Sequence, residues 1–176
     1  MNGLLRELVA AHRIVRHPEV VAALEPLRLP AEGVPLWGVG SVAVGHGYYA
    51  PDPAGRPAII VPVADDGRLI DLAATGLASR RIAIRTGLGV ILGQDALDRA
   101  VVDQVPLHLF RDPIEWLQHR GAGAVVLDWR AAAFILTDLA GIACTSALLA
   151  ARIDKALRQP LRVPPLFVRE ARRAAA

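Results

Sequence analysis

Three carboxylates in the last third of the chain are the best placed for acid–base or metal chemistry. Asp112 and Glu115 stand at the start of a helix expected over 112–119, and Asp128 follows an apolar strand expected over 123–127. Ligands of α/β sheets bind at the carboxyl ends of the strands, and carboxylate oxygens suit Mg²⁺. One hypothesis is therefore a small Mg²⁺-dependent nuclease or phosphotransferase. The competing interpretation is that Asp112 and Glu115 cap their own helix and that Asp128 caps the next one.

A glycine-punctuated segment at 86–93 has the composition of a phosphate-binding loop but not its spacing. The dinucleotide-binding fingerprint G-x-G-x-x-G would follow Gly87 and Gly89 with a glycine at position 92, whereas the next glycine is Gly93. The G-x-x-x-x-G-K-[ST] motif is also absent from a sequence whose only lysine is Lys155. We interpret the segment as a tight structural turn.

The histidines and the single cysteine predict no metal site. The five histidines have no metal-binding helical spacing. One cysteine excludes an internal disulfide and a cysteine-based zinc site. Cys144 ends an apolar strand, where cysteine usually packs as a small hydrophobe. We expect no cofactor, with Mg²⁺ needed only under the carboxylate hypothesis.

Positive charge concentrates toward the C-terminus. Residues 106–176 carry ten basic and six acidic side chains, whereas residues 1–105 carry ten and eleven. Clustered positive charge attracts nucleic-acid phosphates by counterion release. The other interpretation is a solvated helix face and a basic tail. The candidate nucleic-acid-binding residues are Arg81, Arg85, Arg152, Lys155, Arg158 and Arg162.

The first half of the chain predicts helices followed by an antiparallel hairpin. Residues 2–16 have the apolar spacing of an amphipathic helix, and Pro18 either ends this helix or opens a second short one. A glycine-rich strand is expected over 37–44. Asp66-Gly67 lies between two apolar runs, which is a strong hairpin signal. Pro62 lacks an N–H and is expected at an edge or a bulge.

The last third alternates between strand and helix patterns. Strands are expected over 107–110, 123–127 and 141–144, and a helix capped by Thr145 or Ser146 runs to Gln159. In that helix Leu149, Ile153 and Leu157 are expected to be buried. This order argues for a parallel sheet covered by helices.

The order of these pieces resembles the primase-type Toprim region of phage and plasmid replication proteins. The segment Arg56–Leu69, with its apolar run, Asp65-Asp66-Gly67 and Arg68, is similar to one that precedes the Toprim core. The resemblance covers residues 46–160. It implies a replication or mobile-element context.

The resemblance also implies a copy without the family's metal site. Toprim enzymes hold Mg²⁺ with a Glu after the first strand and a D-x-D after a later one. Those positions fall near Arg111-Asp112 and near Cys144-Thr145-Ser146, so the Glu is absent and the D-x-D position has no carboxylate. The implied domain is degenerate and non-catalytic.

Composition and charge exclude several classes of protein. With 53% hydrophobic and 21% charged residues the chain is not disordered. The most membrane-like stretch, 131–151, contains Asp138, which is expensive in lipid. Arg6 and Glu7 interrupt the place where a signal peptide would be apolar. We therefore expect a cytoplasmic protein that does not contact a membrane.

These inferences predict one α/β or α+β domain over residues 1–176. It comprises an N-terminal helical segment (1–30), a β-rich part with an antiparallel hairpin (36–93), a small, mainly parallel Toprim-like βαβα unit (106–168) and a basic, alanine-rich tail (169–176). The function expected first is a non-catalytic binding or scaffold domain that contacts nucleic acid through a basic C-terminal surface. The alternatives are the carboxylate enzyme and a protein–protein interaction module docking through an apolar patch around Trp37, Tyr48 and Tyr49.

Overall fold

The N-terminal segment is helical, as its apolar spacing predicts. The structure, a computed structural model, describes residues 3–30 and 35–158. Helix α1 (Gly3–Ile14) buries Leu8 and Ala11 and exposes its opposite face. Helix α2 (Pro18–Leu24) begins at Pro18, whose missing N–H has no partner in a first turn in any case. A 3-10 turn, η1 (Glu25–Leu27), follows directly.

Five strands form a closed barrel, which goes beyond the hairpin that the sequence predicts. The strands are β1 (Gly38–Gly45), β2 (Tyr48–Pro51), β3 (Arg56–Asp65), β4 (Arg68–Gly76) and β5 (Ile82–Ile84). Their order around the barrel is β1-β2-β5-β4-β3. Neighbours pair antiparallel except β2 and β5, which meet in parallel at Tyr48 and Ile84. That last pairing closes the barrel.

The hairpin expected at Asp66-Gly67 is confirmed and determines the register of β3 against β4. Asp66 and Gly67 both have positive φ, 47° and 69°, as the tightest hairpin turns require. Asp65 pairs with Arg68 on either side of the turn. Pro62 lies beyond Ile60, the last β3 residue paired with β1, and next to a register shift after Val63. Pro62 therefore has a neighbouring strand on one side only, as expected.

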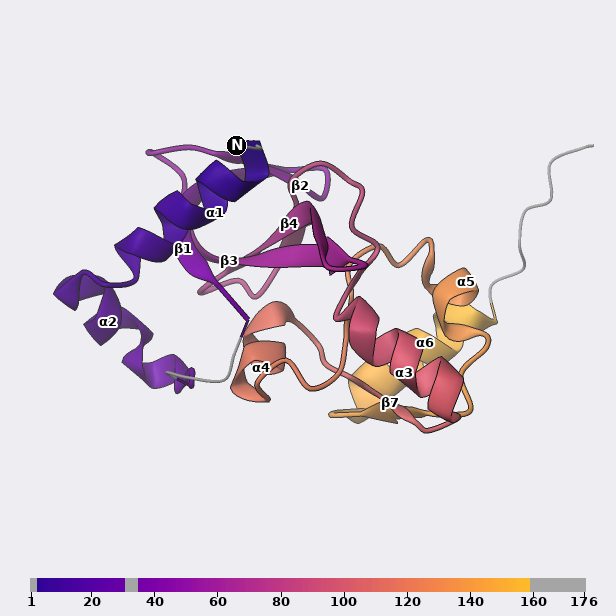
Figure 1. The fold of residues 1–176 in the computed structure, drawn as a ribbon. Coiled ribbons are helices and arrows are strands. Elements are labelled where there is room, and N and C mark those ends of the chain that lie inside the picture. The colour runs from indigo at the N-terminus through magenta and orange to yellow at the C-terminus, as the bar shows by residue number, and fades with distance from the viewer. Residues whose placement is uncertain (1–2, 31–34, 159–176) are drawn as a thin grey trace, which may run out of the picture.

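The remaining chain forms short strands and helices. They are β6 (Ile91–Leu92), α3 (Gln94–Asp103), β7 (Leu107–Leu109), α4 (Pro113–Gln118), β8 (Val125–Val126), α5 (Ala132–Leu136), β9 (Ile142–Cys144) and α6 (Ala147–Leu157). Figure 1 shows α3, α5 and α6 grouped at one end of the molecule and α1 and α2 at the other. The protein is thus of mixed α/β type, as the sequence indicates.

The mainly parallel βαβα unit expected here is not found as one sheet. Within the described residues β7 pairs with β9 in parallel, and β6 pairs with β8 antiparallel. A single parallel bridge between Leu109 and Ala124 links the two pairs. Strands of two or three residues are too short to build the extended sheet that the alternation suggested. The tail at 169–176 and the end of the predicted unit lie outside the described residues.

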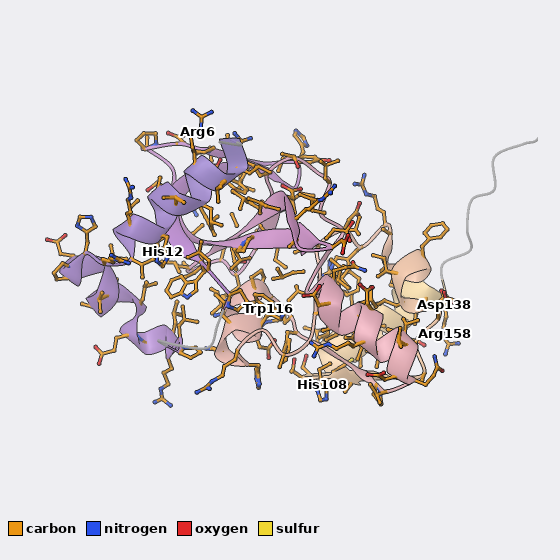
Figure 2. The ribbon with its side chains drawn as sticks, viewed as in Figure 1. Arg6, His12, His108, Trp116, Asp138 and Arg158 are labelled. Carbon is orange, nitrogen blue, oxygen red and sulfur yellow. The ribbon has the colours of Figure 1, made fainter. Side chains whose placement is uncertain are left out.

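Strand β3 is buried on both faces, which places it at the centre of the molecule. Ile59, Val61 and Val63 belong to a cluster that includes residues of α4, among them Trp116. Ala58 and Ile60 point to the other face and pack with Leu8 and Ala11 of α1. Trp116 lies between α4 and the strands (Figure 2). A separate cluster holds α3, α5, α6 and the short strands together.

Helix α6 begins at Ala147, and its N-cap is Ser146, one of the two caps that the sequence offers. The Ser146 Oγ accepts a hydrogen bond from the Leu149 N–H, which caps the helix. Leu149 and Ile153 are buried, as expected. Leu157 is 39% exposed, so the expectation that it is buried is wrong. Leu157, in the last turn of α6, lies at the edge of a hollow that it lines together with Leu136 and Leu139, so the described elements cover it only in part.

Candidate functional site

Asp112 is a buried structural carboxylate. It is 1% exposed and caps α4, its Oδ1 accepting hydrogen bonds from the N–H groups of Ile114 and Glu115. Arg80 donates to both of its oxygens, at 3.0 and 2.8 Å, and Arg111 Nε donates to Oδ2 at 3.1 Å. This network joins the β4–β5 turn to the start of α4. The Asp112 carboxylate thus already accepts five hydrogen bonds from the protein.

Glu115 and Asp128 are also engaged locally. Glu115 Oε2 accepts at 2.7 Å from the N–H of Arg111, the residue before the N-cap Asp112, so Glu115 reaches back to the start of its own helix. Asp128 accepts from the N–H and the guanidinium of Arg130, and these hydrogen bonds hold the pKa of Asp128 below its usual value. No three His, Cys, Asp or Glu side chains in the described part of the chain are gathered as a metal site would need. The geometry matches the helix-capping interpretation at Asp112 and Glu115. The interpretation that Asp128 caps the next helix is wrong, because the N-cap of α5 is Ala131 and the Asp128 carboxylate accepts from Arg130 in a tight local turn.

The glycine-punctuated segment is a structural turn that wraps around Asp71. The Asp71 carboxylate is fully buried in β4. Burial by itself would raise the pKa of Asp71, but hydrogen bonds from the Gly89, Leu72 and Thr86 N–H groups outweigh it, and the pKa lies below its ordinary value. The N–H groups that donate to it, at 2.8–3.1 Å, belong to Leu72, Arg85, Thr86, Gly87, Leu88 and Gly89. These donors are taken by an internal anion, so they are not free to bind a phosphate.

Cys144 is half-buried at the end of β9. It packs against the cluster that holds α5 and α6. Burial raises the pKa of the Cys144 thiol, which keeps it protonated and weakly nucleophilic at neutral pH. Its surroundings agree with the packing role expected from the sequence.

The aromatic patch suggested for protein docking does not form. Tyr49 is 3% exposed, and its hydroxyl donates to Glu7 Oε1 at 2.8 Å. Burial, together with this bond, raises the pKa of Tyr49. Trp37 packs against the central cluster. Of the three residues, only Tyr48 is substantially exposed. The expectation of an apolar docking patch around Trp37, Tyr48 and Tyr49 is therefore corrected.

The predicted basic residues are divided among different surroundings. Arg85 forms an ion pair with Glu7 at 3.0 Å and lies over the Tyr49 ring. Arg158 pairs with Asp154 one turn earlier in α6, and lies at the outer end of the molecule in Figure 2. Lys155 is exposed. Arg162 lies outside the described residues.

Arg81 and Arg152 come together in a cleft that the sequence did not predict. The cleft, about 710 Å³ in volume, lies between the barrel and the C-terminal elements. We call it the arginine cleft because four arginines line it: Arg80 and Arg81 before β5, Arg111 before α4, and Arg152 from α6. His46, Ser79, Trp129 and several apolar and glycine residues complete its lining, which contains no acidic residue.

The arginine cleft keeps most of its positive charge. Asp112 lies beneath it and pairs with Arg80 and Arg111, so one carboxylate offsets four guanidinium groups. The Arg152 guanidinium stacks on Trp129, with its carbon 3.9 Å from the ring centroid. Within the described residues, neither the Arg81 nor the Arg152 side chain takes part in a hydrogen bond or ion pair with another side chain. Their N–H groups therefore remain available to an anion.

A second hollow extends the basic surface. It has a volume of about 800 Å³ and shares Val44, Ser79 and Arg81 with the arginine cleft. Arg56 is its other charged residue, and its lining also lacks acidic residues. Five arginines thus line two adjoining hollows.

Arg80, Arg111 and Trp129 were missed as binding candidates from the sequence. Arg80 directly precedes the candidates Arg81 and Arg85, but the alternation of side chains along a strand places only those two on one face. Arg80 has φ of 55°, so it lies in a turn, where alternation does not apply. No sequence signal links Arg111 or Trp129 to the β4–β5 turn, because only tertiary packing brings them there.

Comparisons with known proteins assign no family. No family model matches the chain, and neither a curated protein nor a solved structure is significantly similar to it. Among the described residues, no helix combines the length and the apolar character that crossing a membrane requires.

Proposed function

We propose that this chain is a non-catalytic nucleic-acid-binding domain that holds a phosphate backbone in the arginine cleft. The observation that carries the proposal is the convergence of four arginines from three separate parts of the chain on a cleft without acidic lining. Arginine is suited to this task because its planar guanidinium binds phosphate oxygens in a bidentate manner. Four guanidinium groups on one cleft, offset by the single carboxylate of Asp112, give it a net positive charge that attracts a polyanion.

The second hollow favours a polymer over a small anion. Arg56 and Arg81 extend the positive surface beyond the arginine cleft. A phosphate backbone carries regularly spaced charges and can contact both hollows, whereas a single small anion occupies one. The replication or mobile-element context remains a proposal that rests on the Toprim-like pattern alone.

The two alternative functions gain no supporting observation. A Mg²⁺-dependent enzyme would need Asp112, Glu115 and Asp128 to be free for metal, and each accepts local hydrogen bonds. A protein-docking module at this patch would need exposed apolar surface, but Tyr49 is buried and Trp37 is partly buried against the central cluster.

Salt-dependent binding tests the proposal. Fluorescence anisotropy with a labelled oligonucleotide measures affinity across a salt series, and the logarithm of the binding constant should fall linearly with the logarithm of salt concentration. Arg81→Ala and Arg152→Ala should each weaken binding and reduce the slope by about one unit per lost phosphate contact. Arg13→Ala, an exposed arginine of α1 that lines no hollow described above, is the matched control.

Two results would contradict the proposal that the arginine cleft binds nucleic acid. One is an absence of binding by the full chain at low salt. The other is an equal loss of affinity in the Arg13→Ala control and the cleft variants, because the contact would then be spread over the whole basic surface.

A further inference from the structure

The size and lining of the arginine cleft point to one form of nucleic acid. Resting on the function proposed above, we infer that the cleft takes a single-stranded segment and that one base stacks on the Trp129–Arg152 pair. A volume of about 710 Å³ lies in the range of pockets that enclose small ligands. A duplex keeps its bases paired inside the helix and offers only its outer phosphates, so it leaves such a cleft unfilled.

The Trp129–Arg152 pair provides a flat surface for a base. The Arg152 guanidinium carbon lies 3.9 Å from the centroid of the indole ring, and both residues line the cleft. Bases of single strands stack on aromatic rings and on guanidinium planes. Trp129 packs against the cluster that holds α5 and α6, so the platform is supported from below. A base entering the cleft either stacks on the guanidinium or takes its place on the indole.

The other arginines are placed to bind the phosphates beside that base. Asp112 holds Arg80 and Arg111 in defined orientations through hydrogen bonds of 2.8–3.1 Å. Groups already ordered lose less conformational entropy when a ligand binds. Arg81 adds an unpaired guanidinium where the two hollows adjoin. The arrangement combines stacking with backbone contacts, which is how proteins bind single strands without reading their sequence.

The test uses the full chain and four fluorescein-labelled probes of equal length. These are a single-stranded DNA, the corresponding RNA, the DNA duplex, and a DNA strand with abasic sites that retains the phosphates but lacks bases. Both natural single strands should bind at least tenfold more tightly than the duplex and the abasic strand. One base stack accounts for about that factor. The comparison between DNA and RNA identifies which strand the cleft prefers.

Intrinsic fluorescence locates the stack. Binding of an unlabelled single strand should quench tryptophan emission, and Trp129→Phe should abolish the quenching while changing affinity by about threefold or less, because phenylalanine still stacks. Trp37→Phe, which replaces a tryptophan packed against the central cluster, should retain the quenching. The abasic probe requires no variant, so a folding defect in Trp129→Phe leaves the test decisive.

The outcomes separate this inference from the proposed function. Equal affinity for natural and abasic strands, with both weakened by Arg81→Ala, would overturn the stacking inference and leave backbone binding intact. Duplex binding as tight as single-strand binding would have the same consequence. Absence of binding to every probe at low salt would overturn both.

Discussion

The replacement Asp71→Asn removes the internal anion around which residues 85–89 are wrapped. Each carboxylate oxygen accepts three backbone hydrogen bonds. Asparagine has the same shape, so it leaves no cavity, but one oxygen becomes an NH₂ group that cannot accept. Three N–H donors then face another donor inside the protein. The change therefore isolates hydrogen bonding and charge from packing.

The loss of stability expected for Asp71→Asn is a large fraction of the free energy of unfolding of a domain. Hydrogen bonds to a charged group contribute about 1.5–3 kcal/mol each, so three of them set an upper range of about 5–9 kcal/mol. Thr86, Gly87 and Leu88 are exposed, so the loop can move and recover part of this by bonding to water. We expect a decrease of about 3–5 kcal/mol in the free energy of unfolding. Domains have only about 5–15 kcal/mol in all.

Urea denaturation followed by circular dichroism measures the effect. The control is Asp52→Asn, because Asp52 accepts one backbone hydrogen bond, from Ala54, in an exposed turn. The control should lose about 1 kcal/mol or less. If Asp71→Asn cost no more than the control, the six contacts would not stabilise the fold as we argue.

The pH dependence of stability reports the same carboxylate. The pKa of Asp71 in the folded chain is lower than usual, whereas in the unfolded chain it is about 3.9. The stabilisation is then complete above the unfolded pKa and is lost as the pH falls toward the folded pKa. The stability difference between the natural chain and Asp71→Asn should be constant from about pH 8 to pH 5 and shrink below about pH 4. A difference that already shrank between pH 7 and pH 5 would contradict the sign of the shift.

Two further substitutions test the packing of the helices by denaturation. Gly38→Ala should cost about 1–3 kcal/mol, because a Cβ there would overlap the Ala11 backbone and push α1 away from β1, whereas Gly3→Ala meets no neighbour and should be neutral or slightly stabilising. An equal effect at both positions would mean that α1 does not lie closely on β1. Ile153→Ala should cost about 2–5 kcal/mol, since Ile153 is 4% exposed, and Leu157→Ala about 1 kcal/mol or less. Similar losses at the two α6 positions would show that the helix is buried along its whole length.

Local signals predicted the elements that depend on neighbours in the chain. The apolar spacing of α1, the Asp66-Gly67 turn and the Ser146 cap are each decided by a few consecutive residues, and all three are found. The capping of α4 by Asp112, with Glu115 reaching back to Arg111, follows from the same kind of signal. Burial of Leu157 was mispredicted because helical periodicity does not show where the covering elements end.

The sequence by itself determined the mixed α/β class, the helix caps, the hairpin and the lack of a nucleotide-binding glycine motif. The caps and the hairpin follow from hydrogen bonds between residues close in the chain, and the class follows from the spacing of apolar residues along it. Only the tertiary structure decided that β2 meets β5 to close the barrel, and that Asp71 fills the turn at 85–89. It also decided that Arg81 and Arg152 share a cleft with Arg80 and Arg111. These contacts join segments that are not neighbours in the chain, 14 residues apart or more. They form because buried charges need hydrogen-bond partners and apolar faces pack against one another, and no pattern of consecutive residues predicts such pairings.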